Sequence, residues 1–250
     1  MESLGKVEKY LRSEIKEKGA IHLTLLDPEK ASLNTAAKIA SEAEKAGTAA
    51  ILLGGSTICS TIQVDLLAKK IKKSVSIPLI LFPGNVSGVS RFADALFFMS
   101  LINSNNPYYI VDAQAISALT IKKYSIEAIP TAYIILGSGG TAGFIGYARC
   151  IPYEKPELAV MYSLAAQYIG MRLVYLEAGS GAKEPIPAEV ISAVKHELSV
   201  PIIVGGGIKK KEDVCAAVKA GADILVTGTL VEESDKVKEK LSGLLKGINR

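Results

Sequence analysis

The sequence has no tryptophan, only three cysteines and only two histidines among its 250 residues. The cysteines (Cys59, Cys150 and Cys215) are far apart and form no CxxC pair, which argues against a disulfide framework and against a structural zinc site. So few thiols suit a reducing compartment, and we expect a cytoplasmic protein. We expect no secretion signal either, because residues 1–19 read as a charged amphipathic helix.

Long hydrophobic runs and strong charge of one sign are also missing. No apolar run approaches the roughly 18 residues that would indicate a membrane span. The net charge is only +4 and the lysines are spread over expected helix surfaces, so we expect no nucleic-acid partner. With 49% hydrophobic and 22% charged residues, the composition is that of a globular protein.

What the sequence does contain is a regular alternation of apolar runs and helical patterns. The runs are rich in β-branched residues and nearly continuous, as expected of parallel strands covered on both faces. They span residues 21–27, 49–55, 78–84, 95–103, 130–138, 172–179, 201–207 and 223–229. Helical patterns occupy most of the gaps, at 33–47, 64–75, 156–170, 188–200 and 210–222, and a last one covers 232–248.

This alternation predicts an α/β fold: a single-domain (β/α)8 barrel of the TIM type over residues 1–250, with an additional N-terminal helix. A doubly wound open sheet is the alternative, which a glycine motif after the first strand would favour. The gap between the third and fourth strands holds only NVSGVSRFAD, which is too short for a crossing helix. We therefore expect the third helix to be missing or irregular and to leave an open flank.

Glycine-rich ends mark the last two expected strands, which read PIIVGGG and DILVTGT. The loops after strands seven and eight of such barrels frequently bind phosphate. Backbone N–H groups at Gly206, Gly207, Gly228 and Thr229 can approach an anion, and the helix that begins near Lys209 directs its positive end the same way. The alternative is that these glycines only form tight turns. The pairing of two such ends favours a phosphate site.

Polar side chains follow other strands at the same end of the barrel, where active sites of this fold lie. Asp27 ends the first strand, Ser56 and Thr57 follow the second, and Tyr175 and Glu177 share one face of the sixth. A carboxylate with a hydroxyl suits Mg²⁺, which is held by few protein ligands. The alternative is that Asp27 caps a helix after Pro28. A carboxylate inside an apolar strand is costly unless it has a role, so we expect Glu177 to act as a base or to bind a hydroxyl.

Three weaker candidates remain. His22 lies at the opposite end of the first strand, where a structural role is expected, and His196 lies on a helix and is expected to face solvent. The segment GSGGTAGFIG (137–146) looks like a mobile loop over the mouth of the barrel.

The motifs HLTLLDPEK, ILLGGST, LFPGN, YLEAGSGA, VGGGI and VTGT, in this order, resemble the geranylgeranylglyceryl phosphate synthases, which are related to bacterial heptaprenylglyceryl phosphate synthases. The resemblance covers almost the whole chain. It implies a Mg²⁺-dependent prenyltransferase that joins sn-glycerol 1-phosphate to geranylgeranyl diphosphate, the first ether-forming step of archaeal membrane phospholipid biosynthesis. A barrel without a normal third helix is also typical of this family.

The resemblance further implies roles for individual residues. Mg²⁺ would bind Asp27 and Ser56, with Thr57 as the alternative to Ser56, and Glu177 and Tyr175 would be catalytic. One branch of the family has a lysine two residues before the metal aspartate, where this chain has Leu25. The chain therefore resembles the other branch, and we expect a homo-oligomer, a dimer or larger, with peripheral membrane contact through its lipid product. The glycerol phosphate would contact Tyr175, Leu176, Glu177, Ala178, Gly179, Ser180, Gly181, Gly206, Gly207, Gly228 and Thr229.

Two other functions remain open from the residues alone: a phosphosugar isomerase or lyase, and a non-catalytic barrel that binds a phosphorylated ligand. The prenyl chain would need a groove outside the filled barrel core, and the flank without a helix offers one. We expect the groove to be lined from an aromatic-rich set, with Tyr133 as its far wall or gate. That set comprises Phe82, Phe92, Phe97, Phe98, Met99, Tyr108 and Tyr109.

Overall fold

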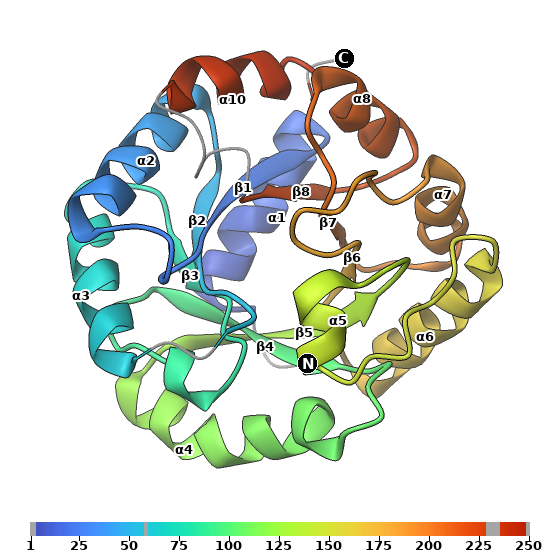
Figure 1. The fold of residues 1–250 in the computed structure, drawn as a ribbon, viewed down its shortest axis with the longest axis horizontal. Helices are drawn as coiled ribbons and strands as arrows, with labels where there is room; N and C mark the ends of the chain where they lie inside the picture. The colour runs from blue at the N-terminus through green and yellow to red at the C-terminus, as the bar shows by residue number, and fades with distance from the viewer. Residues whose placement is uncertain (1–3, 58–59, 229–235, 249–250) are drawn as a thin grey trace.

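The computed structural model describes residues 4–57, 60–228 and 236–248. Its strands form a closed barrel in which each strand pairs in parallel with the next and the last pairs with the first (Figure 1). The predicted (β/α)8 barrel is thus confirmed, and the open sheet is excluded. The strands are β1 (Ile21–Leu26), β2 (Ala50–Leu53), β3 (Leu79–Leu81), β4 (Ala95–Leu101), β5 (Glu127–Ile135), β6 (Leu173–Glu177), β7 (Ile202–Gly205) and β8 (Ile224–Thr227).

Helices surround the barrel as a ring, and two further helices lie inside that ring in the view of Figure 1. The outer helices are α2 (Leu33–Ala46), α3 (Thr61–Lys72), α4 (Ala113–Tyr124), α6 (Pro156–Ile169), α7 (Ala188–Glu197), α8 (Lys211–Lys219) and α10 (Val237–Leu245). The two inner ones are α1 (Lys6–Lys18) and α5 (Gly140–Ile145). Within the described part of the chain, no helix has the length and apolar character needed to cross a bilayer.

The strands alternate between two apolar layers. In β2, Ala50 and Leu52 face the barrel interior, whereas Ile51 and Leu53 pack in the layer between the barrel and the helices. This period of two places every second strand residue inside the barrel and leaves the residues at the strand ends to form the mouth.

The connection between β3 and β4 contains only a 3₁₀ turn at Val86–Gly88, so the predicted absence of a regular third helix is confirmed. The Asn85 side chain closes this turn by accepting a 2.8 Å hydrogen bond from the Ser87 amide. The flank of the barrel beside β3 and β4 therefore has no helix of its own.

Three details differ from the sequence interpretation. α4, preceded by a π-helical turn at Tyr108–Asp112, was not expected, because its apolar residues have little helical periodicity and several lie on its exposed face. The segment 137–146, expected as a loop, contains the short helix α5. β5 begins at Glu127, before the expected start at Pro130.

Helix α1 closes the N-terminal end of the barrel. Its Val7 and Leu11 side chains pack among the apolar residues of the barrel interior. The Glu127 carboxylate, at the start of β5, accepts hydrogen bonds of 2.7 and 2.9 Å from the first backbone amides of the helix, where a negative charge is favourable. The buried Glu8 carboxylate pairs with Arg172 beside β6, at 2.8 Å. These hydrogen bonds and this ion pair therefore hold α1 across the N-terminal end of the barrel.

Candidate active site

A polar cavity of about 510 Å³ lies at the C-terminal ends of the strands. It contains most of the residues that the sequence singled out, brought together from β1, β2, β6, β7 and β8. Its lining includes Asp27, Ser56, Thr57, Tyr175, Glu177, Ser180, Gly181, Gly206, Gly207 and Gly228. Residues separated by most of the chain length thus meet at one site.

Glu177 is the buried carboxylate of this cavity, with 6% of its surface exposed. Its Oε1 accepts a 2.7 Å hydrogen bond from the Gly179 amide, and the hydroxyls of Tyr133 and Tyr175 also donate to it. Burial raises the pKa of the Glu177 carboxyl above its ordinary value, although these hydrogen bonds act in the opposite direction. Burial, reinforced by the nearby Glu177 charge, raises the pKa of both tyrosine hydroxyls, which therefore stay protonated as donors.

The glycines at the end of β7 and just after it make room for these two side chains. A Cβ atom on Gly205 would lie 2.3 Å from the Tyr175 hydroxyl, and one on Gly206 would lie 2.7 Å from Glu177 Oε1. Gly206 and Gly207 also have positive φ angles of 85° and 73°, which favour glycine. The glycines therefore have two effects: they allow the turn, and they leave the space that the Tyr175 and Glu177 side chains occupy.

Asp27 lies at the end of β1 beside the backbone of β2. Its Oδ1 accepts a 3.0 Å hydrogen bond from the Glu29 amide, and the Lys30 ammonium lies 4.0 Å from Oδ2. The expected alternative, a helix cap, does not apply, because Ser32 caps the next helix. A Cβ on Gly55 would approach the Asp27 carboxylate to 3.1 Å, so the glycine keeps the space beside the carboxylate open.

The two hydroxyls after β2 differ in their surroundings. Thr57 donates a 2.6 Å hydrogen bond to the Glu29 carboxylate. Ser56 instead lines both the polar cavity and a second, apolar one. The described residues hold no cluster of three or more histidine, cysteine or acidic side chains. A cation here would therefore have few protein ligands.

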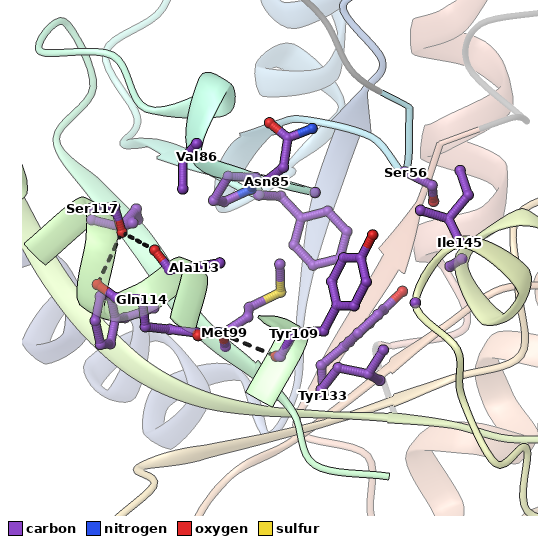
Figure 2. A pocket seen from close by; sticks show the side chains of 18 of the residues that line it. Ser56, Asn85, Val86, Met99, Tyr109, Ala113, Gln114, Ser117, Tyr133 and Ile145 are labelled. Carbon is purple, nitrogen blue, oxygen red and sulfur yellow. Dashed lines mark hydrogen bonds between the residues drawn. The ribbon is translucent and has the colours of Figure 1, made fainter. Parts of the chain in front are cut away.

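The second cavity is an apolar groove of about 100 Å³ between α4 and the connection from β3 to β4, which has no regular helix. Figure 2 shows Ser56, Tyr133 and Ile145 on one side of the view and residues of α4 on the other. Gln114, on α4, donates hydrogen bonds to the carbonyls of Met99 and Tyr109, which ties the helix to β4. Phe82, Val86, Val89, Phe98 and Ala142 also line the groove.

Only part of the expected aromatic set lines this groove. Phe82, Phe98, Met99 and Tyr109 do, and Tyr133 stands where the groove meets the polar cavity. The other three members lie elsewhere. Phe92 packs on the helical layer beneath Lys69, Phe97 fills the barrel interior, and the Tyr108 ring packs edge-to-face on Tyr109.

Not every expected glycerol phosphate residue lines the cavity. Leu176 and Ala178 belong to the layer between the barrel and the helices, because alternate residues of β6 face outward. Gly179 acts through its amide on Glu177 and packs against Gly139 of the segment before α5. Thr229 falls outside the described residues.

Three lysines on the cavity rim were not identified from the sequence as a group: Lys30, Lys209 and Lys240. Lys209 follows the glycine turn, a position that sequence reasoning noted only as a helix start. Lys240 comes from α10, and no sequence pattern indicates that this helix reaches the mouth. Together they offer positive charge to an anionic ligand.

The two histidines lie away from the cavity. His22 is buried between Thr48 and Thr227, with ring nitrogens 2.8 and 2.9 Å from their hydroxyl oxygens. The Thr48 hydroxyl donates its one proton to the His22 carbonyl, so we assign the ring proton to Nδ1. Burial lowers the His22 pKa to about 3. His196 is exposed on α7, as expected.

A model described as the PcrB family matches residues 13–247 of the chain. The chain belongs to the PcrB family. Among its relatives, geranylgeranylglyceryl phosphate synthase of Thermococcus gammatolerans is 51% identical, with 99% of each chain covered. The enzyme of the same name from Methanothermobacter thermautotrophicus is 49% identical, over 97% of this chain and 98% of the relative.

Solved structures agree with this PcrB assignment. The (S)-3-O-geranylgeranylglyceryl phosphate synthase of Thermoplasma acidophilum, solved with its substrate sn-glycerol-1-phosphate, is 42% identical. It has a TM-score of 0.92, with 96% of this chain and 98% of that chain covered. A thiamine phosphate pyrophosphorylase of Pyrococcus furiosus, 14% identical with a TM-score of 0.59 and covering 94% of this chain and 97% of its own, shares the fold alone.

Proposed function

We infer that the protein is a geranylgeranylglyceryl phosphate synthase, a prenyltransferase of lipid biosynthesis. It joins the 3-hydroxyl of sn-glycerol 1-phosphate to C1 of geranylgeranyl diphosphate in an ether bond and releases diphosphate. The observation that carries this function is that the two cavities adjoin and share lining residues. A polar cavity with a buried base lies next to an apolar groove, which supports a reaction between a small phosphorylated alcohol and a hydrocarbon chain.

Glu177 accepts the proton of the glycerol 3-hydroxyl as that oxygen attacks C1. Its raised pKa makes it a stronger proton acceptor than an exposed glutamate. The hydroxyls of Tyr133 and Tyr175 donate to the same carboxylate and fix its orientation. The electron pair of the broken C1–O bond leaves with the diphosphate.

The glycerol phosphate is held by backbone groups. Gly181, Gly206, Gly207 and Gly228 line the cavity without side chains that would keep an anion at a distance. The N-terminal end of α8 follows this turn, and the positive end of a helix favours a phosphate. Lys209 adds a formal charge on the same side.

The residues near Asp27 fit a magnesium ion. Asp27 and Ser56 would hold it, because both line the cavity with oxygen atoms and Thr57 already donates to Glu29. When bound, Mg²⁺ would neutralise charge on the diphosphate leaving group. Lys30 and Lys240 lie on the same rim and add positive charge for this anion.

One assay tests the function. The protein is incubated with Mg²⁺, sn-glycerol 1-phosphate and labelled geranylgeranyl diphosphate, and an ether-linked product is expected. Omitting the glycerol phosphate is the control that identifies hydrolysis of the diphosphate. A wild-type protein that gives no ether product contradicts the function. The phosphosugar isomerase or lyase and the non-catalytic barrel are not favoured, because the relatives bear a prenyltransferase name.

The metal assignment has its own test. We expect Asp27→Asn nearly to abolish turnover while the fold stays intact, because the neutral amide binds Mg²⁺ poorly. Circular dichroism checks the fold, and calorimetric titration with Mg²⁺ in the presence of diphosphate checks binding. Near-normal activity at limiting Mg²⁺ contradicts Asp27 as a ligand.

We also propose a cytoplasmic homo-oligomer that meets the membrane through its lipid product. Large apolar side chains stay exposed on two outer helices, with Leu119 of α4 at 80% and Tyr168 of α6 at 79%, which supports a further interface. Light scattering of the purified protein measures its mass, and a monomer at assay concentration contradicts the oligomer.

A further inference from the structure

The polar cavity and the apolar groove have five lining residues in common among those described: Gly55, Ser56, Phe82, Tyr133 and Ala142. On the proposed function, the diphosphate occupies the cavity and the hydrocarbon occupies the groove. C1 of the prenyl substrate joins the two parts, so it lies against these residues. The only π-systems among them are the rings of Phe82 and Tyr133.

We propose that Phe82 and Tyr133 are catalytic residues whose rings stabilise the positive charge that develops on C1. This rests on the proposed function, because the charge arises only when the C1–O bond to the diphosphate breaks. The electron pair of that bond leaves with the diphosphate, the glycerol O3 forms the new bond to C1, and its proton passes to Glu177. Between these events the allylic carbon carries positive character.

The ring geometry suits a cation. The centroids of Phe82 and Tyr133 are 5.6 Å apart with an interplanar angle of 84°, and Tyr175 packs on both at 5.4 and 5.2 Å. A cation is attracted to a ring when it lies over the ring face within about 6 Å of the centroid. The proposal therefore requires that C1 lies over a face of Phe82 or Tyr133 at the junction. The attraction is strengthened because both side chains are buried, with Phe82 at 7% and Tyr133 at 9% exposed.

An aromatic ring suits this position better than a charged group. A carboxylate would also attract the carbon but can form an ester with it, whereas a phenyl ring offers no such nucleophile. The rings also occupy space that water would otherwise fill. Water attacking C1 would give the prenyl alcohol and diphosphate in place of the ether. The two rings thus stabilise the charge and limit this side reaction.

The test compares binding of a charged and a neutral mimic of the prenyl group. Geranylgeranylammonium carries a positive charge beside C1, and geranylgeraniol has the same chain without the charge. Each is titrated into the protein with Mg²⁺ and inorganic diphosphate. The diphosphate attracts the ammonium in every variant. A difference between variants in the ratio of the two dissociation constants therefore measures how much the rings contribute to binding the positive charge.

We expect Phe82→Leu and Tyr133→Leu each to reduce the preference for the ammonium by about 3- to 30-fold, the range from an exposed to a desolvated cation–π contact. The single-turnover rate should fall by a similar factor, and the share of prenyl alcohol among the products should rise. Tyr133→Phe keeps the ring and loses the hydroxyl, so it should keep the ammonium preference. Phe97→Leu removes a ring that packs 6.3 Å from Phe82 inside the barrel, and serves as the packing control.

Two outcomes overturn the proposal. If Phe82→Leu and Tyr133→Leu keep the wild-type preference for the ammonium, the rings do not stabilise the charge. If Phe97→Leu loses the preference equally, the effect belongs to general packing. Ether formation by the wild type is measured in parallel. If the wild type forms the ether but the leucine variants keep its preference for the ammonium, only this proposal is refuted. If the wild type forms no ether, the proposed function and this proposal are both refuted.

Discussion

The Thr57 hydroxyl donates a 2.6 Å hydrogen bond to the carboxylate of Glu29, whereas the neighbouring Ser56 lines the junction of the two cavities. This difference separates two adjacent hydroxyls that the sequence could not rank. It makes Ser56 the better candidate for the hydroxyl ligand of Mg²⁺, with Thr57 holding the turn that follows Asp27.

We expect Ser56→Ala to raise the Mg²⁺ concentration for half-maximal activity by about tenfold, the loss of about 1.4 kcal/mol of binding free energy. Thr57→Val, the matched control, should leave this concentration nearly unchanged. The measurement is a Mg²⁺ titration of initial rates, supported by calorimetric titration with diphosphate present. The reverse pattern would reassign the ligand to Thr57.

Glu177→Gln should lower the single-turnover rate by about 10²–10⁴-fold, the usual contribution of a positioned base, with little change in diphosphate binding. The same variant should melt at an equal or higher temperature. The raised pKa means that burying the ionised carboxylate costs stability at neutral pH, and the neutral amide removes that cost. Rapid-quench kinetics and a thermal melt provide the two values. An effect limited to KM for the prenyl substrate would contradict the role of base.

Acid should destabilise the protein through His22. Its pKa is about 3 in the folded state and about 6.5 when unfolded, so the unfolded chain binds the proton first as the pH falls below 6.5. Between pH 6.5 and 5 this costs about 2 kcal/mol of unfolding free energy. Urea unfolding at each pH, in wild type and His22→Gln, measures the loss. Glu177 acts with the opposite sign in both proteins, so a steeper loss in the wild type reports the histidine; equal slopes would contradict the prediction.

The prenyl groove can be tested with two phenylalanines close in sequence. Phe98 lines the groove, whereas Phe92 packs beneath Lys69 on the helical layer. We expect Phe98→Ala to lower kcat/KM for the C20 diphosphate about tenfold and for the C10 diphosphate least, because only the longer chain reaches the lost contact surface. Phe92→Ala is the control and should affect all lengths alike. Equal losses at every length in Phe98→Ala would place the chain elsewhere.

The strands could be predicted because parallel strands covered on both faces appear in the sequence as nearly continuous apolar runs. β1 to β8 all fall at or near the expected positions, and the missing third helix followed from the length of one gap. The sequence of α4 shows no comparable pattern, because residues such as Ile116 and Leu119 are apolar yet exposed. A helix with apolar residues on both faces has no periodic signal.

The residues that line the polar cavity were predictable at the strand ends and less so away from them. Asp27, Ser56 and Glu177 could be named because the fold places strand ends together. Phe92 belonged to the aromatic set expected for the groove but does not line it, because it lies between strands, where alternation gives no direction. Lys240 comes from the last helix, and sequence patterns do not show that this helix reaches the mouth. The reason for glycine at 205 and 206 required the positions of Tyr175 and Glu177.

Helix α1, held in place by Glu127 and Glu8, covers the N-terminal end of the barrel and leaves the opposite end and the flank as the routes to the polar cavity. With Val7 and Leu11 filling the lower barrel, the polar cavity is a blind chamber at that end. Glu177 is more deeply buried than Asp27. On the proposed function, a prenyl diphosphate held at Asp27 would lie nearer to solvent than the base. We therefore expect glycerol phosphate to bind first. Product-inhibition patterns would show compulsory order, and random order would mean that the flank admits the small substrate as well. Because α1 covers the lower end, the order of binding depends on whether each substrate enters through the mouth or through the flank.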